Sequence, residues 1–294
     1  MQKFNFLNKE KKIKRVLILG SSGIISKNFQ MILKKEKIPF LAVGRKKINL
    51  TKKKSIKKLS KLVKKDDVIL FLASNAPVKN LSTYIENINI CETVYESIEE
   101  KKISQFCYIS SDAVYTDSKY KLNESSLAEP SNFHGLMHIT REKILSLKFK
   151  NKLCILRPTM IYGKHDSHYG YGPNLFLRQI NLNKNINIFG KGEERRDHVY
   201  INDLIEILLI CLKRNARGIV NVASGNVFSF YSIALEIVKN IYTKVKIINI
   251  KRNGPMPHNG FRPFDVSLLK KKFKTVKLTS FKTGLKKYMK SLEK

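Results

Sequence analysis

The sequence predicts an α/β protein built on a doubly wound parallel sheet, with a second and smaller domain toward the C-terminus. Short apolar runs alternate with segments whose apolar residues recur at helical spacing, which is the pattern of successive β-α-β units. The first run, residues 16–19, ends in a glycine turn that leads directly into a helix. Beyond about residue 160 the alternation loosens, which indicates that a different domain begins there.

The expected elements follow in order along the chain. Strands are expected at 16–19, 40–44, 67–73, 106–111 and 153–158, and later at 186–189, 219–223 and 245–250. Helices are expected near 24–33, 52–64, 82–101 and 135–148, and later at 203–213 and 229–242. In doubly wound sheets, ligands bind beyond the carboxyl ends of the strands. We therefore look for a site among the residues that follow each strand.

The glycine turn after the first strand is the first candidate binding element. Gly20 lets the chain turn sharply, and Gly23 lets the backbone approach a ligand closely. The helix that follows directs unpaired N–H groups and the positive end of its dipole at the turn, which suits a pyrophosphate. Ser26 takes the third small position. The candidate contacts here are Gly20, Ser22, Gly23, Ile24 and Ile25. The alternative is an ordinary strand-to-helix turn, because one glycine turn alone is a weak signal.

Composition excludes several classes of protein. A hydrophobic content of 43% over 294 residues indicates a globular chain with a large core. No apolar run approaches the length of a membrane span, so no membrane partner is expected. The net charge of +34 would attract nucleic acid, but the lysines are spread over the whole chain and lack interleaved aromatic residues. We attribute the charge to biased composition and expect no nucleic-acid partner.

The N-terminus and the cysteines indicate a cytoplasmic protein. Residues 1–14 are polar and lysine-rich, without the apolar segment of a secretory signal, and we expect a loose lead into the first strand. The cysteines lie far apart in apolar segments, and no two have the spacing of metal ligands or a redox pair. We expect four reduced core thiols and no resident metal.

Five motifs in sequence resemble one known family. They are Gly20-x-x-Gly23, the segments 109–115, 156–163 and 190–203, and Asn221-Val-Ala-Ser-Gly225. Together they resemble the extended short-chain dehydrogenase/reductases, and within these the NAD(P)-dependent nucleotide-sugar epimerases and dehydratases. The resemblance covers about residues 14–290.

The resemblance implies a Rossmann domain and a smaller domain that holds a nucleotide-diphospho-sugar. It places a loose lead at residues 1–13, the dinucleotide-binding domain at 14–163 and the substrate domain at 164–294. Residues 190–225 partly return to the first domain. It also implies that Asn89 is the buried asparagine of the dinucleotide domain and that Ser111 hydrogen-bonds the sugar. The further cofactor contacts that we assign by this resemblance are Gly44, Arg45, Leu72, Ala73, Ser74, Asn89, His138 and Arg157.

The sequence departs from the family at the catalytic Tyr-x-x-x-Lys, which falls on His134 and His138. Pro130 before the motif and Glu142 after it support this register. An imidazole titrates near neutral pH, so His134 can carry the proton that the family's tyrosine carries. His138 lies one turn further on the same helix face and can hydrogen-bond the nicotinamide ribose. We assign Ser111, His134 and His138 as the catalytic residues.

Two alternatives remain open for the histidine pair. One is a site that has lost its activity on a retained fold, which would make the protein a silent nucleotide-sugar-binding regulatory subunit. The other is a metal clip formed by the two histidines, which would need a third ligand from His165, Asp166 or His168.

Two further departures narrow the chemistry. Dehydratases of this group carry two acidic residues after the active-site Ser or Thr, whereas here Asp112 is followed by Ala113. The second strand ends in Gly44-Arg45, with no acid to accept a ribose 2′-hydroxyl. Arg45 can pair with a 2′-phosphate, which favours NADP over NAD.

The expected function is hydride transfer at a sugar carbon by a nucleotide-sugar epimerase or 4-ketoreductase. By resemblance, the substrate contacts are Ser111, Asp112, Asn174, Arg196 and Arg262. Arginine suits a diphosphate because its planar fork binds two phosphate oxygens. A two-fold dimer is expected through the helices at 82–101 and 135–148.

Overall fold

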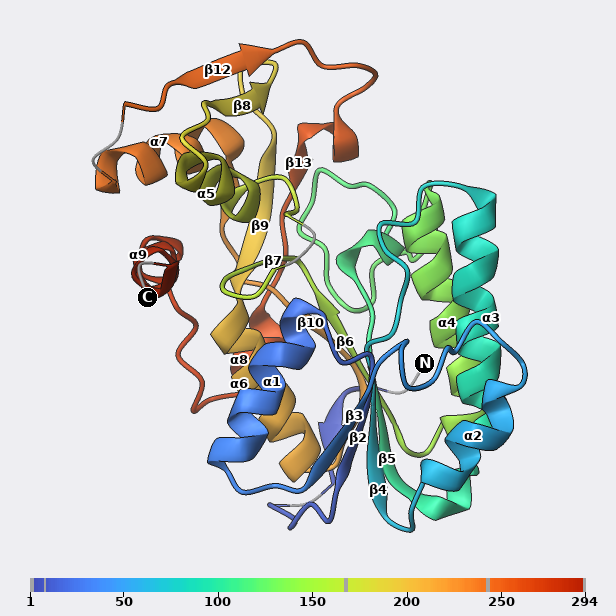
Figure 1. Ribbon diagram of the computed structural model, residues 1–294. Helices are drawn as coiled ribbons and strands as arrows, with labels where there is room; N and C mark the ends of the chain where they lie inside the picture. Colours follow the sequence, from blue (N-terminus) through green and yellow to red (C-terminus); the bar gives the residue numbers. More distant parts are fainter. Residues whose placement is uncertain (1–2, 8, 167–168, 242–243, 293–294) are drawn as a thin grey trace. The chain divides into compact units, whose positions relative to one another are not determined.

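The computed structural model describes residues 3–7, 9–166, 169–241 and 244–292, and the chain folds into two compact units (Figure 1). Unit 1 contains Met1–Thr116, Glu124–Pro158 and Ile205–Asn221, and unit 2 contains Asp117–Asn123, Thr159–Leu204 and Val222–Lys294. The segment that returns to the first unit, Ile205–Asn221, is shorter than the returning segment expected from the sequence.

Unit 1 is built on a seven-stranded sheet in the order β1-β10-β6-β5-β4-β2-β3. The strands are β1 (Asn5–Phe6), β2 (Val16–Leu19), β3 (Phe40–Val43), β4 (Asp67–Phe71), β5 (Ile103–Ile109), β6 (Leu153–Pro158) and β10 (Ala216–Val222). Strand β2 pairs in parallel with both β3 and β4, and β4, β5 and β6 continue the parallel pairing. The strand order therefore reverses beside β2, and such a reversal opens a crevice at the carboxyl ends of the strands. The predicted doubly wound sheet is confirmed.

Helices cover both faces of this sheet (Figure 1). Helices α1 (Ile24–Lys35) and α6 (Ile201–Lys213) lie on one face, and α2 (Ser55–Leu62), α3 (Leu81–Ser97) and α4 (Phe133–Phe149) lie on the other. Every residue of β2, β4 and β6 is buried, as expected for central parallel strands. Each fully buried Leu, Ile or Phe contributes about 1.5–3 kcal/mol relative to exposure. All four cysteines are buried and reduced, as predicted.

The N-terminal segment is not the loose lead expected from its lysines. Strand β1 pairs antiparallel with β10, placing Asn5 opposite Arg217, and a bridge joins Lys3 to Ile219. Phe4 and Ile13 are buried, with 4% and 8% of their surfaces exposed. The few apolar residues between the lysines are therefore enough to attach this segment to the sheet edge.

Unit 2 contains two smaller sheets. In the first, the central strand β9 (Arg195–Tyr200) pairs with β7 (Met160–Tyr162), β11 (Val227–Ser229) and β13 (Phe261–Arg262). In the second, β8 (Ile186–Phe189) pairs in parallel with β12 (Ile247–Ile250). The helices are α5 (Pro173–Asn181), α7 (Phe230–Asn240), α8 (Ser267–Lys272) and α9 (Phe281–Leu292). Among the described residues of the whole chain, no helix combines the length and the hydropathy needed to cross a bilayer.

Candidate active site

The glycine turn between β2 and α1 is shaped by one close approach and one open space. Gly20 has φ of +107°, and a Cβ there would lie 2.8 Å from the backbone nitrogen of Ala73 at the end of β4. At Gly23, by contrast, an added Cβ would have no described atom within 4 Å. Gly23 precedes α1 without a side-chain cap, so the first N–H groups of the helix remain available. The turn thus presents N–H donors to an open space, as an anion-binding turn requires.

Ser26 and Gln30 stabilise this turn. Ser26, the residue in the third small position, is 1% exposed. The Gln30 side-chain amide donates to the Ser26 hydroxyl at 3.0 Å and to the Ser21 carbonyl at 3.1 Å. A serine is thus accommodated in the third small position.

A cavity of about 230 Å³ lies beside the turn, at the carboxyl ends of β2, β3 and β4. Of the predicted cofactor contacts, it is lined by Gly20, Ser22, Gly44, Arg45, Ala73 and Ser74. A Cβ on Gly44 would lie 2.3 Å from the Ser21 hydroxyl, so a side chain there would crowd the turn. The structure therefore brings together the predicted contacts from three separate strand ends.

Arg45 stands at this cavity but is already paired. Its guanidinium donates to the Glu86 carboxylate of α3, while 65% of the Arg45 side chain remains exposed. The second Glu86 oxygen accepts a hydrogen bond from Asn75 at 2.6 Å. An acidic residue, Glu86, therefore does lie beside Arg45, although it comes from α3 rather than from the end of β3.

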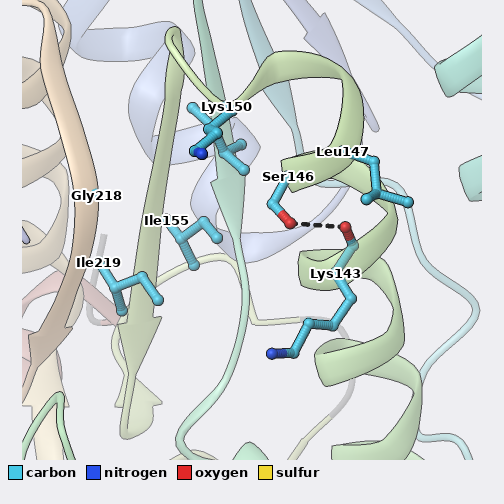
Figure 2. A pocket seen from close by; sticks show the side chains of 8 residues that line it. Lys143, Ser146, Leu147, Lys150, Ile155, Gly218 and Ile219 are labelled. Atoms are coloured by element: carbon cyan, nitrogen blue, oxygen red, sulfur yellow. Dashed lines mark hydrogen bonds between the residues drawn. The ribbon is translucent and has the colours of Figure 1, made fainter. Parts of the chain in front are cut away.

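A larger cavity of about 480 Å³ lies in another part of unit 1, between α4 and the strands β6 and β10 (Figure 2). Leu147, Ile155 and Ile219 line it together with Lys143 and Lys150. The Ser146 hydroxyl is bonded to the Lys143 carbonyl of its own helix, 2.7 Å away. This cavity contains no residue of the glycine turn or the histidine pair, so its size does not make it the candidate site.

The buried asparagine of α3 is Asn87, not Asn89. Asn87 is 0% exposed and clamps the loop after β4, accepting from the Asn75 N–H and donating to the Asn75 carbonyl, each at 2.9 Å. Asn89 is exposed, because two residues along a helix turn the side chain to the opposite side. The prediction for Asn89 is therefore corrected to Asn87.

The start of α4 packs closely against the turn that follows β5. Asn132 caps the helix by accepting from the Gly135 N–H at 2.9 Å. A Cβ on Gly135 would lie 2.1 Å from the Ala113 carbonyl oxygen, so only glycine allows this approach. The short helix η2 (Asp112–Val114) contains Ala113 and is itself capped by Ser111, whose hydroxyl accepts from the Ala113 N–H at 3.1 Å. This contact holds His134, the residue before Gly135, near Asp112.

His134 and His138 lie one turn apart and touch edge to face, with ring centroids 4.8 Å apart and planes at 83°. His134 Nδ1 is buried and has no hydrogen-bond partner among the described residues. His138 Nδ1 lies 2.7 Å from the hydroxyl of Tyr108 on β5. The structure thus places the predicted residues Ser111, Asp112, His134 and His138 in one cluster.

Burial keeps both imidazoles neutral. It lowers the pKa of His134, the Asp112 carboxylate raises that pKa again, and the Arg141 guanidinium lowers it. For His138, burial holds the pKa well below its usual range, and His134 and Arg141 lower it further. Arg141 is 1% exposed and bonds to the carbonyls of Ala73 and Asn87. It therefore provides a permanent positive charge next to the histidines.

Arg157 is paired inside the core of unit 1. Its guanidinium binds the Glu142 carboxylate through two hydrogen bonds of 2.9 and 2.5 Å, and the two side chains are 2% and 0% exposed. Ser110 donates to the same carboxylate at 2.5 Å. These bonds hold Arg157 in the core of unit 1, and its contact with the cofactor stays a prediction.

Asp197 explains two of the sequence motifs in unit 2. Its carboxylate accepts from the Thr159 hydroxyl at 2.9 Å and from the N–H groups of Ser224 and Gly225 at 2.8 and 2.7 Å. These bonds connect β9 with the residues that follow β10. The segments 190–203 and 221–225 thus contain a structural clamp that their order in the sequence did not reveal.

Arg196 and Arg262 are directly opposite each other on the paired strands β9 and β13. Arg196 bonds to Glu194 at 3.3 Å, and Arg252 bonds to the same carboxylate at 3.4 Å. Arg262 is 1% exposed and bonds to Asp117 at 2.8 Å. These three arginines stand among two acids, which leaves a net positive charge.

Asn174, the third predicted substrate contact of unit 2, is used inside the fold. Its amide accepts from the Gly163 N–H and donates to the Ile161 carbonyl, each at 3.1 Å. These bonds tie α5 to the end of β7, and the contact of Asn174 with substrate stays a prediction.

A metal clip at the histidine pair finds no support in the described part of the chain. No group of three His, Cys, Asp or Glu residues there is arranged to hold a metal ion. His168, one candidate third ligand, lies outside the described residues.

Sequence reasoning missed four residues near the candidate site. Tyr108, Arg141 and Glu86 contact the residues assigned above and Asn87 contacts Arg141, yet none of the four belongs to a motif. Tyr108 and Arg141 could have been noticed because each is a polar residue in a segment whose apolar pattern predicts burial in the core. Such residues are buried only when they have partners.

A dinucleotide fits the residues of unit 1. The uncapped start of α1, the open space at Gly23 and the adjoining cavity suit a pyrophosphate and an adenosine ribose. The orphaned His134 Nδ1 leaves a buried polar atom in need of a partner.

Known proteins were compared with the chain by sequence and by structure. The dTDP-D-glucose 4,6-dehydratase of Homo sapiens is 25% identical over an alignment of 262 residues, which covers 78% of this chain and 74% of that protein. The fold matches that of UDP-glucose 4-epimerase from Thermotoga maritima, solved with UDP-glucose, with a TM-score of 0.82 at 16% identity, over 95% of this chain and 98% of that one. It also matches a GDP-L-fucose synthetase from Naegleria fowleri bound to NADP, with a TM-score of 0.78 at 16% identity, over 97% and 95% of the two chains.

The family model of the NAD dependent epimerase/dehydratase family matches residues 16–223. These residues contain the sheet of unit 1 from β2 onward, the glycine turn and the histidine pair. The chain therefore belongs to the NAD-dependent epimerase/dehydratase family.

Proposed function

We propose that this protein is an NAD(P)-dependent nucleotide-sugar epimerase or 4-ketoreductase, and thus an isomerase or an oxidoreductase, acting by hydride transfer at a sugar carbon. The observation that supports this most is the cluster of Ser111, Asp112, His134 and His138 in the same unit as the dinucleotide-type turn. An active site of this family needs proton-carrying groups near the cofactor. The positions of the family's catalytic tyrosine and lysine both carry imidazoles here.

His134 is the proton carrier in this proposal. Because burial keeps its imidazole neutral near pH 7, it can accept a proton from a sugar hydroxyl. The Asp112 carboxylate then stabilises the imidazolium that forms. When bound, NAD(P) supplies the hydride exchange. Ser111 orients the same hydroxyl, and His138 binds the nicotinamide ribose.

Arg196 and Arg262 bind the nucleotide diphosphate in this proposal, with Arg252 beside them. Their neighbouring positions on β9 and β13 allow two guanidinium groups to meet adjacent phosphates. Glu194 and Asp117 orient these side chains and leave the cluster positive. A nucleoside diphosphate without the sugar is therefore expected to bind.

Epimerisation or ketoreduction is favoured over 4,6-dehydration. A dehydratase of this group uses a second acid after the active-site Ser or Thr, and Ala113 cannot move a proton. Its carbonyl oxygen instead faces Gly135. A 4-keto-6-deoxy sugar among the products would contradict this assignment.

NADP is favoured over NAD because Arg45 is the cation that follows the end of β3. Glu86 pairs with Arg45 and must be displaced or shared when a 2′-phosphate binds. We therefore expect a preference for NADP of only modest size.

A homodimer through α3 and α4 is part of the proposal. Leu81 and Ile85 on α3 and Leu136 and Leu147 on α4 are exposed apolar residues, with Leu147 81% exposed. Light scattering at micromolar concentration is expected to give a dimer, and a monomer would contradict it. A cytoplasmic location is proposed with it and can be tested by cell fractionation.

The decisive experiment identifies nucleotide sugars that co-purify with the protein by mass spectrometry and then assays a panel of them for turnover with NAD and NADP. Epimerised or reduced sugar with the wild-type protein supports the proposal. Tight binding of nucleotide sugar and cofactor without turnover or solvent hydrogen exchange would instead identify a silent regulatory subunit.

A further inference from the structure

Tyr108 is a buried tyrosine whose hydroxyl touches the histidine pair. It lies on β5, is 1% exposed, and packs between Phe71 and His138 at centroid distances of 5.4 and 5.9 Å. Its hydroxyl oxygen is 2.7 Å from His138 Nδ1. Burying a hydroxyl this deeply costs free energy unless it is hydrogen-bonded, and the hydrogen bond to His138 offsets that cost.

The direction of this hydrogen bond follows from the available partners. Burial raises the pKa of Tyr108 and lowers that of His138, so both groups are neutral near pH 7. Among the described residues, the Tyr108 hydroxyl has no acceptor other than His138 Nδ1. Arg141, which also lies near the hydroxyl, can only donate. The Tyr108 O–H therefore donates to Nδ1, and the His138 proton is on Nε2.

We propose that Tyr108 is a positioning residue that fixes His138 as the Nε2–H tautomer and so turns a hydrogen-bond donor toward the cofactor. The part of this proposal that concerns the cofactor rests on the proposed function. The part that concerns the tautomer of His138 does not. His138 Nε2 has no partner among the described residues and is not one of the sealed polar atoms, while 8% of the side chain is exposed. The N–H is thus available to a ligand.

In this proposal, three residues together take the place of the lysine in the family's Tyr-x-x-x-Lys motif. The family's lysine supplies both a donor to the ribose and a permanent positive charge. Here, the neutral His138 supplies the donor, Tyr108 orients it, and the buried Arg141 on the next turn of α4 supplies the charge. Arg141 bonds to carbonyls and to the Asn87 amide and has no acidic partner in the described chain, so its charge is not cancelled.

The groups that face His138 determine how it titrates. Tyr108 faces it from β5, and His134 and Arg141 face it from α4. Tyr108 stabilises the neutral imidazole by donating to Nδ1, and Arg141 disfavours the imidazolium. Loss of the Tyr108 hydroxyl should therefore raise the pH at which His138 becomes protonated.

The test measures the imidazole nitrogens directly by ¹⁵N NMR. The chain has only six histidines, so a His138→Gln variant assigns the resonances. For the wild-type protein at pH 7 we expect an unprotonated Nδ1 and a protonated Nε2 on His138. In Tyr108→Phe we expect the Nδ1 resonance to move and the titration midpoint to rise by about one pH unit, since a net hydrogen bond is worth about 1 kcal/mol.

Tyr115→Phe is the matched control. Tyr115 lies in the same unit, is 2% exposed, and donates to Asn221 at 2.7 Å, so its substitution removes an equivalent buried hydrogen bond away from His138. It should leave the His138 nitrogens unchanged. An Nδ1–H or doubly protonated His138 in the wild-type protein at pH 7 would overturn the proposal, even if Tyr108→Phe failed to fold. An unchanged Nδ1 resonance and midpoint in a folded Tyr108→Phe would also overturn it.

Cofactor titration then separates this proposal from the proposed function. Tyr108→Phe should weaken NAD(P) binding about tenfold through His138, while Tyr115→Phe should not, tenfold being about 1.4 kcal/mol. If neither NAD nor NADP binds the wild-type protein, the proposed function fails, and the NMR result still decides the tautomer. If the cofactor binds equally well to both variants, the donor role of His138 is overturned.

Discussion

The glycine turn before α1 and the start of α4 both contain a glycine at a close backbone contact, but they differ in the space that remains for a ligand. At both places a helix begins where a glycine lets two backbone segments approach. At the turn, the space in front of Gly23 stays open, and the proposed cofactor contacts are backbone N–H groups. At α4, the space in front of Gly135 is filled by the Ala113 carbonyl, and the proposed catalytic groups are the neighbouring side chains.

The departure from the family's Tyr-x-x-x-Lys motif, at His134 and His138, falls in the region where side chains carry the proposed chemistry. Binding through the backbone depends on chain geometry, so a glycine position cannot change without moving the helix. Chemistry carried by side chains can pass to another residue type if its neighbours adjust. At α4 the side chains next to the histidine pair are Tyr108, Asp112 and Arg141.

The largest expected effect separates the two histidines. His134→Phe should reduce turnover about a thousandfold, because removal of a general acid or base costs 10²–10⁴ in rate, while cofactor binding stays nearly intact. His138→Phe should instead weaken cofactor binding. Steady-state kinetics and calorimetry measure the two effects.

The pH profile adds a control. As a base, His134 must be neutral, and its lowered pKa predicts that activity falls only as the pH drops below the usual histidine range. Activity that survives His134→Phe would exclude this histidine from the mechanism.

The next effect compares the two glycines. Gly135→Ala should destabilise unit 1 by about 1–3 kcal/mol, because the new methyl group overlaps the Ala113 carbonyl oxygen. Gly23→Ala, where φ is −73° and the space is open, should leave stability within about 0.5 kcal/mol but weaken cofactor binding. Urea denaturation and cofactor titration of both variants test this, and equal losses of stability would remove the distinction between the two glycines.

A smaller effect concerns acid stability. Because the folded state keeps His134 and His138 neutral, the unfolded state binds more protons below about pH 6.5. The free energy of unfolding should be unaffected above that pH and should fall as the pH drops, by about 1.4 kcal/mol per histidine for each tenfold difference in proton affinity. Urea denaturation between pH 8 and 5 should show this fall, and His138→Gln should reduce it. An unchanged pH dependence in that variant would show that His138 is already charged when folded.

The smallest effect is expected at Arg45. Arg45→Ala should remove a preference for NADP of at most about fivefold, since an exposed ion pair contributes about 0.2–1 kcal/mol. Glu86→Gln should increase the preference by releasing Arg45. Calorimetry with both cofactors measures these changes, and equal affinities for NAD and NADP in the wild-type protein would contradict the assignment.

The sequence was sufficient to predict elements that depend on local pattern. The strand at 16–19 and the glycine turn follow from apolar runs and from backbone freedom, and both are present in the structure. The helix with His134 and His138 and the buried Glu142 was placed in register by its motif. Pairings that depend on the assembled core were not predictable.

Arg157 and Asn174 show what a motif leaves unsaid. Each stands at a position that the motifs assign to ligand binding, and the structure adds partners within the fold, 15 and 11 residues away in sequence. Asn89 was misplaced by two residues, because either helix position satisfies the sequence pattern and only packing against the loop after β4 selects Asn87. Tyr108 was invisible because its partner lies on another element.

The pairing of β1 with β10 has a consequence for aggregation. An open strand edge presents unsatisfied N–H and C=O groups to which another chain can add a strand, and proteins protect such edges with short or charged segments. Here, two residues flanked by lysines cover part of the β10 edge. The covering segment comes early in the chain, whereas β10 comes late, so the β10 edge can be protected as soon as it is made.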